Sequence, residues 1–578
     1  MTMRALPQPR SRRARFFSGC AVLVGLTLMA TTGALPDEGN RSPAIVFRPV
    51  QDSVGLTFLH QNGASPRKHM IETMGSGGGF IDFDNDGFLD VYLVQGARLD
   101  ESGKPTGTGG RLFHNLGGRR FEDVTEGSGI RTTDWYGMGV AVADFDNDGW
   151  QDLFLTGYPR NYLFRNLGTG RFADVSTGAG VSGGGWSTSA AFFDYDNDGW
   201  LDLYVCRYVD YDPLTEPSCG AEKEGWKSYC LPDAFKGISG LLFRNSGGQF
   251  KEVTRETGVY RPEAKSLGVT ISDFDNDGNQ DLFVANDRVR NFLFRNEGAG
   301  RFLERGELAG VAYSSDGQVR AGMGVDFADA DNDGQPDVLV TNFETEGAAL
   351  FRNLNGLFED VAMFSELGPR SFLHVGFGAK LVDLDGDGWR DIFLVNGHVL
   401  DNIALYKDGV SYLDKKQVFR HLGGHKFVYL ESALTSSPAA VGRGAAFGDY
   451  DNDGKVDVLV TNNGGAAELL RNESPGRNRW MAFKLVGTQS NRDAIGARLE
   501  LRAGGLRYRA EVASSGSYLS SHDLRVYVGL GTNERVEQVL IHWPSGLTEQ
   551  LTDLKPNRIL RVVEGASPSA KEKPQSQP

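Results

Sequence analysis

Short stretches in which apolar and polar residues alternate recur along the chain, and each one follows a run of aspartates. Directly after each run, apolar residues stand at every second position, which is the period of a β-strand with one buried face. The seven pairs are Val91 and Leu93, Leu153 and Leu155, Leu203 and Val205, Leu282 and Val284, Val338 and Val340, Ile392 and Leu394, and Val458 and Val460. We expect each pair to pack against a neighbouring unit of the same kind.

A second string accompanies the aspartates in each unit. It runs Leu-Phe-Arg-Asn, a glycine-rich turn, Phe, and then an acidic residue and Val, and it is clearest from residues 163, 242 and 350 onward. Each unit therefore contains four short strands: one entering the aspartate run, one leaving it, the Leu-Phe-Arg-Asn strand and the Phe strand. Seven such units, 50 to 79 residues apart, predict an all-β fold in which four-stranded blades form a seven-bladed β-propeller.

The seventh unit lacks its last strand. No Phe strand follows residues 469–472, whereas residues 46–50, upstream of the first aspartate run, have the form of that strand. We therefore expect a propeller over residues 44–475 in which residues 44–60 complete the last blade and remove an exposed edge.

The aspartate runs share a nine-residue form that points to metal binding. Asp stands at positions 1, 3, 5 and 9, and Gly at position 6, where it permits a sharp turn. Position 4 is Asn in six copies and Gly386 in the other, and both residues tolerate a left-handed backbone. Four carboxylates this close repel one another unless a cation sits between them, and hard oxygen ligands suit Ca²⁺. The sequence thus predicts up to seven Ca²⁺ ions, each with the carbonyl of position 7 as a further ligand.

The predicted metal ligands are Asp82, Asp84, Asp86 and Asp90; Asp144, Asp146, Asp148 and Asp152; Asp194, Asp196, Asp198 and Asp202; Asp273, Asp275, Asp277 and Asp281; Asp329, Asp331, Asp333 and Asp337; Asp383, Asp385, Asp387 and Asp391; and Asp449, Asp451, Asp453 and Asp457. An EF-hand shares the opening spacing, but it needs a bidentate Glu at position 12 and flanking helices. Position 12 is Leu or Val in every copy here, which excludes an EF-hand. Solvated acidic turns remain the alternative for any single loop.

The net charge of −15 comes from these loops. They hold 28 of the 75 acidic residues, which leaves 47 acidic residues elsewhere against 55 basic residues after residue 34. The acidic chain has no basic stripe, so we expect no nucleic-acid partner.

Residues 1–34 have the composition of a secretory signal. Five arginines and no acidic residue precede an apolar run from residue 16 to residue 30, and small residues follow. The predicted signal peptide implies a secreted or periplasmic protein, by either the general or the twin-arginine route. An uncleaved membrane anchor is the alternative, although about 15 apolar residues fall short of the roughly 20 that a spanning helix needs.

Three cysteines follow the signal. Cys219 and Cys230 lie 11 residues apart in a stretch rich in Pro, Gly and charge, which favours a disulfide bond between them in an oxidising compartment. Cys206 ends a strand pattern and is expected to be a buried thiol, but spacing alone leaves its pairing with either of the others open.

The last part of the chain predicts a second, smaller all-β domain. Residues 478–565 contain six or so short strands, around 481–486, 497–502, 507–512, 525–529, 538–543 and 559–563, which suits a small β-sandwich-like domain. The tail, residues 566–578, is rich in Ser, Pro, Lys and Gln and is expected to be disordered.

These motifs resemble two known families. The aspartate repeats look like FG-GAP (VCBS-type) repeats, as in integrin-α-like propellers, whose Asp-x-Asp-x-Asp-Gly loops hold Ca²⁺. Residues 490–498, with 516–518, 528–531 and 543–546, resemble the ASPIC/UnbV domain. Together they resemble the cartilage acidic protein family, bacterial branch, over nearly the whole mature chain. Cys206 departs from the family pattern.

The sequence favours a binding or adhesion module for an extracellular protein or glycan, with no catalytic residues. An enzyme using the propeller mouth and a structural component of an envelope assembly are the alternatives. The enzyme alternative depends on His374 and His398, which could line a central channel, although hydrogen-bonded strand-end histidines are the simpler interpretation. No G-x-S-x-G, H-E-x-x-H or nucleotide-binding loop occurs. The sequence does not indicate an oligomeric state.

Overall fold

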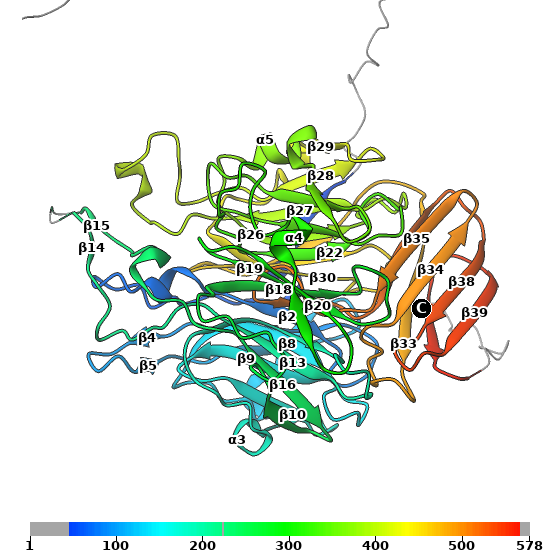
Figure 1. Ribbon diagram of the computed structural model, residues 1–578, viewed down its shortest axis with the longest axis horizontal. Coiled ribbons are helices and arrows are strands. Elements are labelled where there is room, and N and C mark those ends of the chain that lie inside the picture. The colour runs from blue at the N-terminus through cyan, green and yellow to red at the C-terminus, as the bar shows by residue number, and fades with distance from the viewer. Residues whose placement is uncertain (1–44, 222, 224, 567–578) are drawn as a thin grey trace, which may run out of the picture. The chain divides into compact units, whose positions relative to one another are not determined.

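The structure is a computed structural model that describes residues 45–221, 223 and 225–566 (Figure 1). The predicted signal, residues 1–34, and the predicted tail beyond Ala566 lie outside the described residues. The described residues belong to one compact unit, and none of their helices has the length and apolar character needed to cross a membrane.

Seven sheets within the described residues each contain one aspartate run, six of them with four strands and one with five. Every sheet has the same antiparallel core, in which the strand entering the run pairs with the strand leaving it. The first three sheets are β2 (Gly78–Ile81), β3 (Asp90–Leu93), β6 (Arg111–Asn115) and β7 (Phe121–Asp123); β8 (Tyr136–Ala143), β9 (Asp152–Tyr158), β10 (Tyr162–Asn166) and β11 (Phe172–Asp174); and β12 (Ser187–Phe193), β13 (Asp202–Arg207), β16 (Leu241–Ser246) and β17 (Gln249–Glu252).

The other four sheets repeat this order. They are β18 (Ser266–Ser272), β19 (Asp281–Asn286), β20 (Phe292–Asn296) and β21 (Phe302–Glu304); β22 (Val325–Ala328), β23 (Asp337–Val340), β24 (Ala349–Asn353) and β25 (Phe358–Asp360); β26 (Gly376–Val382), β27 (Asp391–Asn396), β28 (Gln417–His421) and β29 (Phe427–Tyr429); and β30 (Gly442–Gly448), β31 (Asp457–Asn462), β32 (Glu468–Asn472) and β1 (Phe47–Pro49). Four-stranded antiparallel sheets of this kind are typical of propeller blades.

The first strands of the seven sheets form a closed circuit of contacts. In chain order, β2, β8, β12, β18, β22, β26 and β30 each contact the next, and β30 contacts β2. Figure 1 shows β2 lying between β30 and β8. The last sheet also takes its outer strand from the start of the chain, since β1 pairs with β32 and places Phe47 opposite Asn472.

The alternating apolar pairs face the preceding sheet, as predicted. Leu153 and Leu155 are fully buried and belong to one apolar cluster with Ile81 and Val94 of the first sheet. The corresponding pairs of the other sheets are equally buried, and each shares a cluster with the sheet before it. Apolar burial between sheets therefore holds the circuit together.

Helices among the described residues are single turns. They are α1 (Gln51–Val54), α2 (Thr125–Ser128), α3 (Ser176–Ala179), α4 (Gly306–Ala309), α5 (Leu367–Ser371), and the 3-10 turns η1 (Met70–Thr73), η2 (Pro232–Ala234), η3 (Ala362–Phe364), η4 (Ile403–Leu405) and η5 (Glu431–Leu434). Two small hairpins lie outside the seven sheets: β4 (Arg98–Leu99) with β5 (Pro105–Thr106), and β14 (Cys219–Gly220) with β15 (Lys227–Ser228).

The cysteine predictions are confirmed. A disulfide bond joins Cys219 to Cys230, and Cys206 is a fully buried free thiol.

The C-terminal domain consists of two sheets around an apolar core. One contains β37 (Val526–Gly531), β33 (Arg479–Val486) and β40 (Arg558–Val563), and the other β35 (Leu506–Glu511), β34 (Arg498–Ala503), β38 (Val536–His542) and β39 (Thr548–Leu554). Figure 1 shows the second sheet in orange and red. The six predicted strands correspond to six of these strands. Strand β39 has no alternating apolar pattern that would predict it, because Leu551 is its only buried residue.

A loop of the C-terminal domain, residues 514–522, runs among the first strands of the seven sheets; we call it the central segment. Its strand β36 (Ser520–Ser521) pairs in parallel with β2 and supplies the fifth strand of the first sheet. The Leu519 carbonyl accepts a hydrogen bond from Val140, the Ser517 hydroxyl from the amide of Ala379, and His522 from the amide of Phe447. Strands β2, β8, β26 and β30 are thus bound to one segment from the other domain.

Candidate metal sites

The aspartate loops adopt the turn that their residue types predict. In all seven, position 4 is left-handed, with φ between 56° and 73°, and the Gly of position 6 also has positive φ. Asn and Gly enter the left-handed region of backbone conformation most readily, so the seven loops turn alike.

Backbone amides hold the aspartates of positions 1 and 9. In the second loop, Asp144 accepts hydrogen bonds from the amides of Asp148 at 3.0 Å and Gly149 at 2.7 Å. Asp152 is fully buried and accepts from the amides of Phe145 and Asn166. Every aspartate of position 9 accepts from the two equivalent amides, that of position 2 in its loop and that of the last residue of the Leu-Phe-Arg-Asn string. These aspartates are Asp90, Asp152, Asp202, Asp281, Asp337, Asp391 and Asp457.

The structure brings the carboxylates of positions 1, 3 and 9 together in at least three loops of the described residues. The groups whose candidate ligand atoms lie within 4.8 Å of one another are Asp144, Asp146 and Asp152; Asp194, Asp196 and Asp202; and Asp273, Asp275 and Asp281. In the fifth loop, Asp329, Asp331 and Asp333 form such a group, and in the first loop Asp84 and Asp86 do so with His114. Position 9 therefore contributes in loops two to four, whereas Asp82 and Asp90 stand outside the group of the first loop.

Position 3 carries buried oxygen atoms that lack a hydrogen-bond donor. These are the Oδ1 atoms of Asp146, Asp196, Asp275 and Asp451. A buried carboxylate oxygen without a partner destabilises the fold by roughly 1–3 kcal/mol or more, and a cation bound there removes that cost. The oxygen donors and the repeated position of these atoms fit Ca²⁺, with the aspartates of each loop as its ligands.

The aspartate of position 5 bonds to the backbone of its own turn and also pairs with an arginine. Its Oδ1 accepts the amide of position 7 in each loop, at Asp86, Asp148, Asp198, Asp277, Asp333, Asp387 and Asp453. The arginine comes from the Leu-Phe-Arg-Asn strand and pairs with positions 3 and 5 together. In the second unit, Arg165 lies 3.0 Å from Asp148 and also contacts Asp146.

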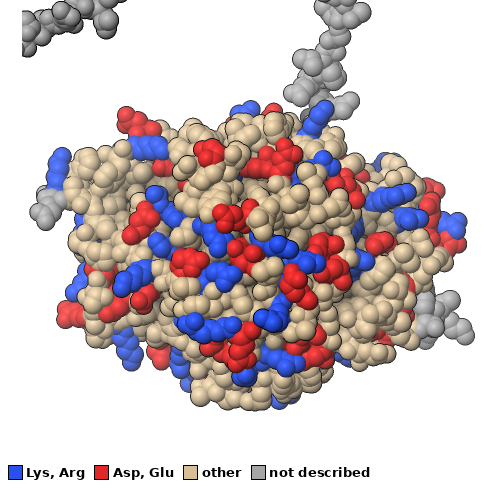
Figure 2. All heavy atoms as spheres, viewed as in Figure 1, with Lys and Arg blue, Asp and Glu red and all other residues tan. Residues whose placement is uncertain are grey.

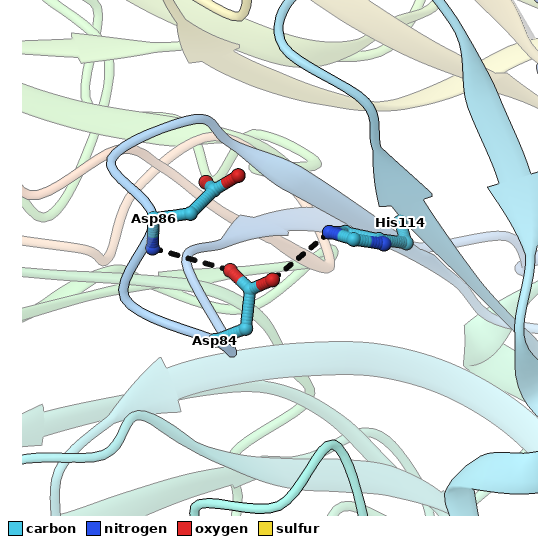
Figure 3. Close-up of side chains that lie close together, drawn as sticks. All are labelled: Asp84, Asp86 and His114. Atoms are coloured by element: carbon cyan, nitrogen blue, oxygen red, sulfur yellow. Dashed lines mark hydrogen bonds and ion pairs between the residues drawn. The ribbon is translucent and has the colours of Figure 1, made fainter.

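The same pairing occurs with Arg244, Arg295, Arg352, Arg420 and Arg471. In the first unit His114 replaces the arginine, and its Nε2 lies 2.9 Å from Asp84 Oδ2 (Figure 3). This role of the arginine was not predicted from the sequence, although the recurring Arg of the Leu-Phe-Arg-Asn string is a signal for it.

Burial sets the charge state of the loops in the absence of metal. It raises the pKa of Asp194 to about 7 and, with the charge of Asp493, that of Asp144 to about 8. Burial also raises the pKa of Asp449 to about 8 and that of Asp90 to about 9. These carboxyl groups need either a proton or a cation at neutral pH.

Asparagine side chains tie neighbouring loops together. Asn166, the last residue of the Leu-Phe-Arg-Asn string, donates to the carbonyl of Phe83 in the preceding loop and to that of Gln151 in its own loop, at 2.8 and 3.1 Å. Five other units repeat this pair of bonds, through Asn115, Asn245, Asn296, Asn353 and Asn472.

The sixth unit differs at two positions. His421 stands in place of the asparagine and bonds to Gly424, and Gly386 stands at position 4. Gly386 instead contacts the C-terminal domain, because the amide of Gly531 donates a hydrogen bond to the Gly386 carbonyl at 2.9 Å. A Cβ on Gly529 would lie 2.6 Å from the Gly386 Cα, so residue 529 has to be a glycine for this contact.

The C-terminal domain contacts other aspartate loops as well. Arg525 donates to the Asp449 carbonyl at 2.8 Å, Lys484 pairs with Asp82 at 2.9 Å, and Asp493 accepts the amide of Asp144 at 2.7 Å. The predicted metal ligands therefore lie at the junction of the two domains.

The histidines considered as catalytic candidates have structural partners. His398 is buried and accepts a hydrogen bond from the amide of Leu400 at 2.9 Å, and His374 pairs with Asp414 at 2.8 Å.

The chain matches two family models. Residues 82–155, 144–205, 273–340, 329–394 and 383–460 match the FG-GAP-like repeat, and residues 487–569 match the ASPIC and UnbV family. Cartilage acidic protein 1 of Mus musculus is 26% identical over 54% of this chain and 47% of its own length. The Homo sapiens protein of the same name is 25% identical over 54% of this chain and 46% of its own length. The matched region thus spans about half the length of these curated relatives.

Solved structures similar to the chain include an Agrocybe aegerita lectin described as recognising non-reducing terminal N-acetylglucosamine. Its TM-score is 0.38 at 16% identity, covering 67% of this chain and 85% of the lectin. The structure of YCF48 bound to D1 peptide has a TM-score of 0.39 at 10% identity, and the match covers 72% of this chain and 95% of YCF48.

Proposed function

Since the chain belongs to the FG-GAP-like repeat family and carries an ASPIC and UnbV domain, we propose that it is a calcium-loaded, seven-bladed β-propeller that acts as a secreted or periplasmic binding module for a protein or glycan. The observation that carries the proposal is the set of buried, partnerless carboxylate oxygens at position 3 of four aspartate loops. Calcium at those oxygens shapes the loops on which the C-terminal domain rests.

The contacts between sheets support the seven blades. The first strands form one circuit, and the pairing of β1 with β32 joins the beginning of the propeller to its end. A ring closed in this way leaves no long sheet edge open to aggregation.

Export is supported by the disulfide bond between Cys219 and Cys230, because structural disulfides are typical of proteins outside the cytosol. On the face shown in Figure 2, basic and acidic side chains are interspersed, which favours a protein or glycan partner over a nucleic acid.

The central segment favours binding over catalysis at the propeller mouth. Tyr518 and Leu519 are fully buried among the first strands, so the middle of the ring is filled by the protein itself. A ligand would then bind at the periphery or at the domain junction.

The test combines metal analysis with a binding screen. Elemental analysis of the mature protein after dialysis against calcium should show several Ca²⁺ ions per chain. Arrays of glycans and extracellular proteins, probed with and without calcium, should show binding that chelator abolishes. A protein without calcium would refute the metal-loaded propeller, and binding unchanged by chelator would refute calcium-dependent recognition.

A further inference from the structure

The first aspartate loop faces a different side chain from the other six. In each of the other units an arginine of the third strand pairs with positions 3 and 5, whereas β6 of the first unit carries His114 at that place. A guanidinium group stays protonated and only donates, but a neutral imidazole nitrogen offers a lone pair to a metal ion. The exchange of arginine for histidine thus puts a group that can bind metal where the other units have a counter-ion.

The imidazole is directed at the carboxylates of its loop (Figure 3). His114 Nε2 lies 2.9 Å from Asp84 Oδ2, and one ligand atom each from Asp84, Asp86 and His114 lie within 4.8 Å of one another. Two ligands of one zinc ion stand about 3 Å apart, because each bond is roughly 2.0–2.2 Å long. Nε2 makes no hydrogen bond despite its closeness to Asp84, so its lone pair is not taken up by a donor.

The first loop brings fewer carboxylates together than loops two to four do. In those loops the aspartates of positions 1, 3 and 9 form the group, but in the first loop Asp82 and Asp90 stand outside it. Asp82 Oδ2 instead pairs with Lys484 of the C-terminal domain at 2.9 Å. Because a lysine already compensates this carboxylate, the oxygen set of the first loop is poorer than Ca²⁺ requires, which is six to eight oxygen ligands.

The first loop is also the most open of the seven at position 3. The Asp84 side chain is 29% exposed, against 5–18% for position 3 in the other six loops. Asp86 is exposed as well. An ion can therefore reach these side chains from solvent, and water can complete its coordination.

Two carboxylates and an imidazole favour a transition-metal ion over calcium. Ca²⁺ is bound by oxygen atoms, whereas imidazole suits zinc, copper, iron and nickel. Zn²⁺ accepts His nitrogen and Asp oxygen together and usually takes four ligands, so three side chains and one water fill its shell.

We propose that the first loop is a separate metal site, in which Asp84, Asp86 and His114 bind Zn²⁺ or a similar first-row transition-metal ion in preference to Ca²⁺. This inference goes beyond the proposed function, which assigns calcium to the aspartate loops, because it sets one loop apart from the other six. It requires no calcium in those six loops, so the two proposals fail independently.

The test uses the mature chain without a histidine tag, dialysed first against calcium with a small excess of zinc and then against millimolar calcium alone. Elemental analysis should find one zinc ion per chain after the second dialysis. X-ray absorption at the zinc edge should show a nitrogen ligand at about 2.0–2.1 Å. A chain from which calcium displaces all zinc, or a zinc ion with oxygen ligands only, would overturn the inference.

Two variants locate the site. His114→Arg installs the residue of the other six units, so the protein should melt like the wild type but bind zinc at least tenfold more weakly, which corresponds to about 1.4 kcal/mol. His425→Arg is the matched control. His425 Nε2 lies 3.4 Å from Asp331 Oδ2 in the fifth loop, but the metal group of that loop consists of three aspartates, so this variant should keep its zinc.

Zinc binding of wild-type strength in His114→Arg would show that His114 is only a counter-ion, as the arginines are, and would overturn the inference. Equal losses in His114→Arg and His425→Arg would do the same. Calcium is measured in the same samples: normal calcium without zinc refutes this inference alone, and zinc without calcium refutes only the proposed function.

Discussion

The hydroxyl group of Tyr518 donates a hydrogen bond to the carbonyl oxygen of Met74, 2.8 Å away, although 444 residues separate the two in sequence. Tyr518 is fully buried, and its ring also packs edge-on against Phe377. One side chain of the central segment thus contacts both the first and the sixth units of the propeller.

Replacing this tyrosine tests how strongly the segment is held. Tyr518→Phe keeps the ring but leaves the Met74 carbonyl unpaired, and we expect the free energy of unfolding to fall by roughly 1–3 kcal/mol. Denaturant unfolding measures the change. Tyr406→Phe is the control, because its hydroxyl bonds to Trp226 at the surface and its loss should cost less. Equal effects of the two substitutions would contradict a buried anchor.

Calcium removal should destabilise the propeller. Each metal-free loop concentrates four carboxylates, and ligand linkage gives about 2.7 kcal/mol per site at a free concentration 100 times the dissociation constant. We expect chelator to lower the melting temperature by many degrees and magnesium, which demands tighter geometry, to restore it poorly. Scanning calorimetry with each ion measures this, and melting that ignores chelator would refute the metal sites.

The second loop allows a finer test. Asp144→Asn combined with Asp148→Asn should remove one ion per chain and lower stability only in part, because six loops remain. The matched control neutralises Glu122 and Glu126, two acidic residues outside the aspartate loops. Calcium content measured on the two double variants separates loss of a ligand from loss of charge.

Glu564 predicts acid sensitivity in the C-terminal domain. It is 2% exposed and accepts hydrogen bonds from the amides of Thr488, Gln489 and Ser490 and the hydroxyl groups of Ser490 and Ser545. Burial alone would raise its pKa, but these donors outweigh burial and lower the pKa to about 2. Because the folded pKa lies below the usual 4.5, the stabilisation is present above pH 4.5 and is lost as the pH falls toward 2.

Glu564→Gln removes that charge. We expect a loss of roughly 1–3 kcal/mol at neutral pH and a flatter dependence of stability on pH between about 5 and 2. Denaturant unfolding at several pH values checks both expectations. Parallel pH curves for the variant and the wild type would show that Glu564 does not titrate in this window.

Deleting residues 45–50 tests the closure of the ring. The deletion removes β1, exposes the backbone of β32 and leaves groups such as the Leu469 carbonyl without their partner. We expect a lower melting temperature and a tendency to aggregate. A truncated protein that melts and sediments like the full mature chain would rule out a stabilising role for β1.

The asparagine hydrogen bonds that join neighbouring loops predict that a single substitution lowers the stability of the protein considerably. Asn166→Ala leaves the carbonyls of Phe83 and Gln151 unpaired in buried surroundings, so we expect a loss of about 1–3 kcal/mol for each. His421→Asn, in the unit that lacks the tie, is the complementary variant and should stabilise the protein. A destabilised His421→Asn variant would show that the bond between His421 and Gly424 matters more.

Local sequence determines the parts of this structure that could be predicted. The turn of each aspartate loop depends on Asn or Gly at position 4 and Gly at position 6, and the strand after it on pairs such as Leu153 and Leu155, so both follow from a few adjacent residues. The short spacing of Cys219 and Cys230 likewise favours the disulfide bond that joins them, although spacing alone does not exclude Cys206.

The features that sequence did not reveal depend on distant contacts. Residues 514–522 have no strand period, and Tyr518 is buried because it packs in one apolar cluster with residues far away in sequence, such as Met138 and Phe377. The pairing of Arg165 with Asp146 and Asp148 needs the third strand of the blade beside its loop. The cavity of about 670 Å³ that is lined by both the propeller and the C-terminal domain forms only where the two meet, so no local sequence pattern marks it.

The exceptional sixth unit resolves a problem that every ring of similar repeats poses. A second domain that packs against such a ring could, in principle, contact any of the repeats in an equivalent way. Here the sixth loop offers the carbonyl of Gly386 to Gly531, and Gly529 packs directly against its backbone. The repeats are therefore not interchangeable where the C-terminal domain packs: the backbone contact at Gly386 and the side-chain contacts of Arg525, Lys484 and Asp493 to other loops together fix one orientation of that domain.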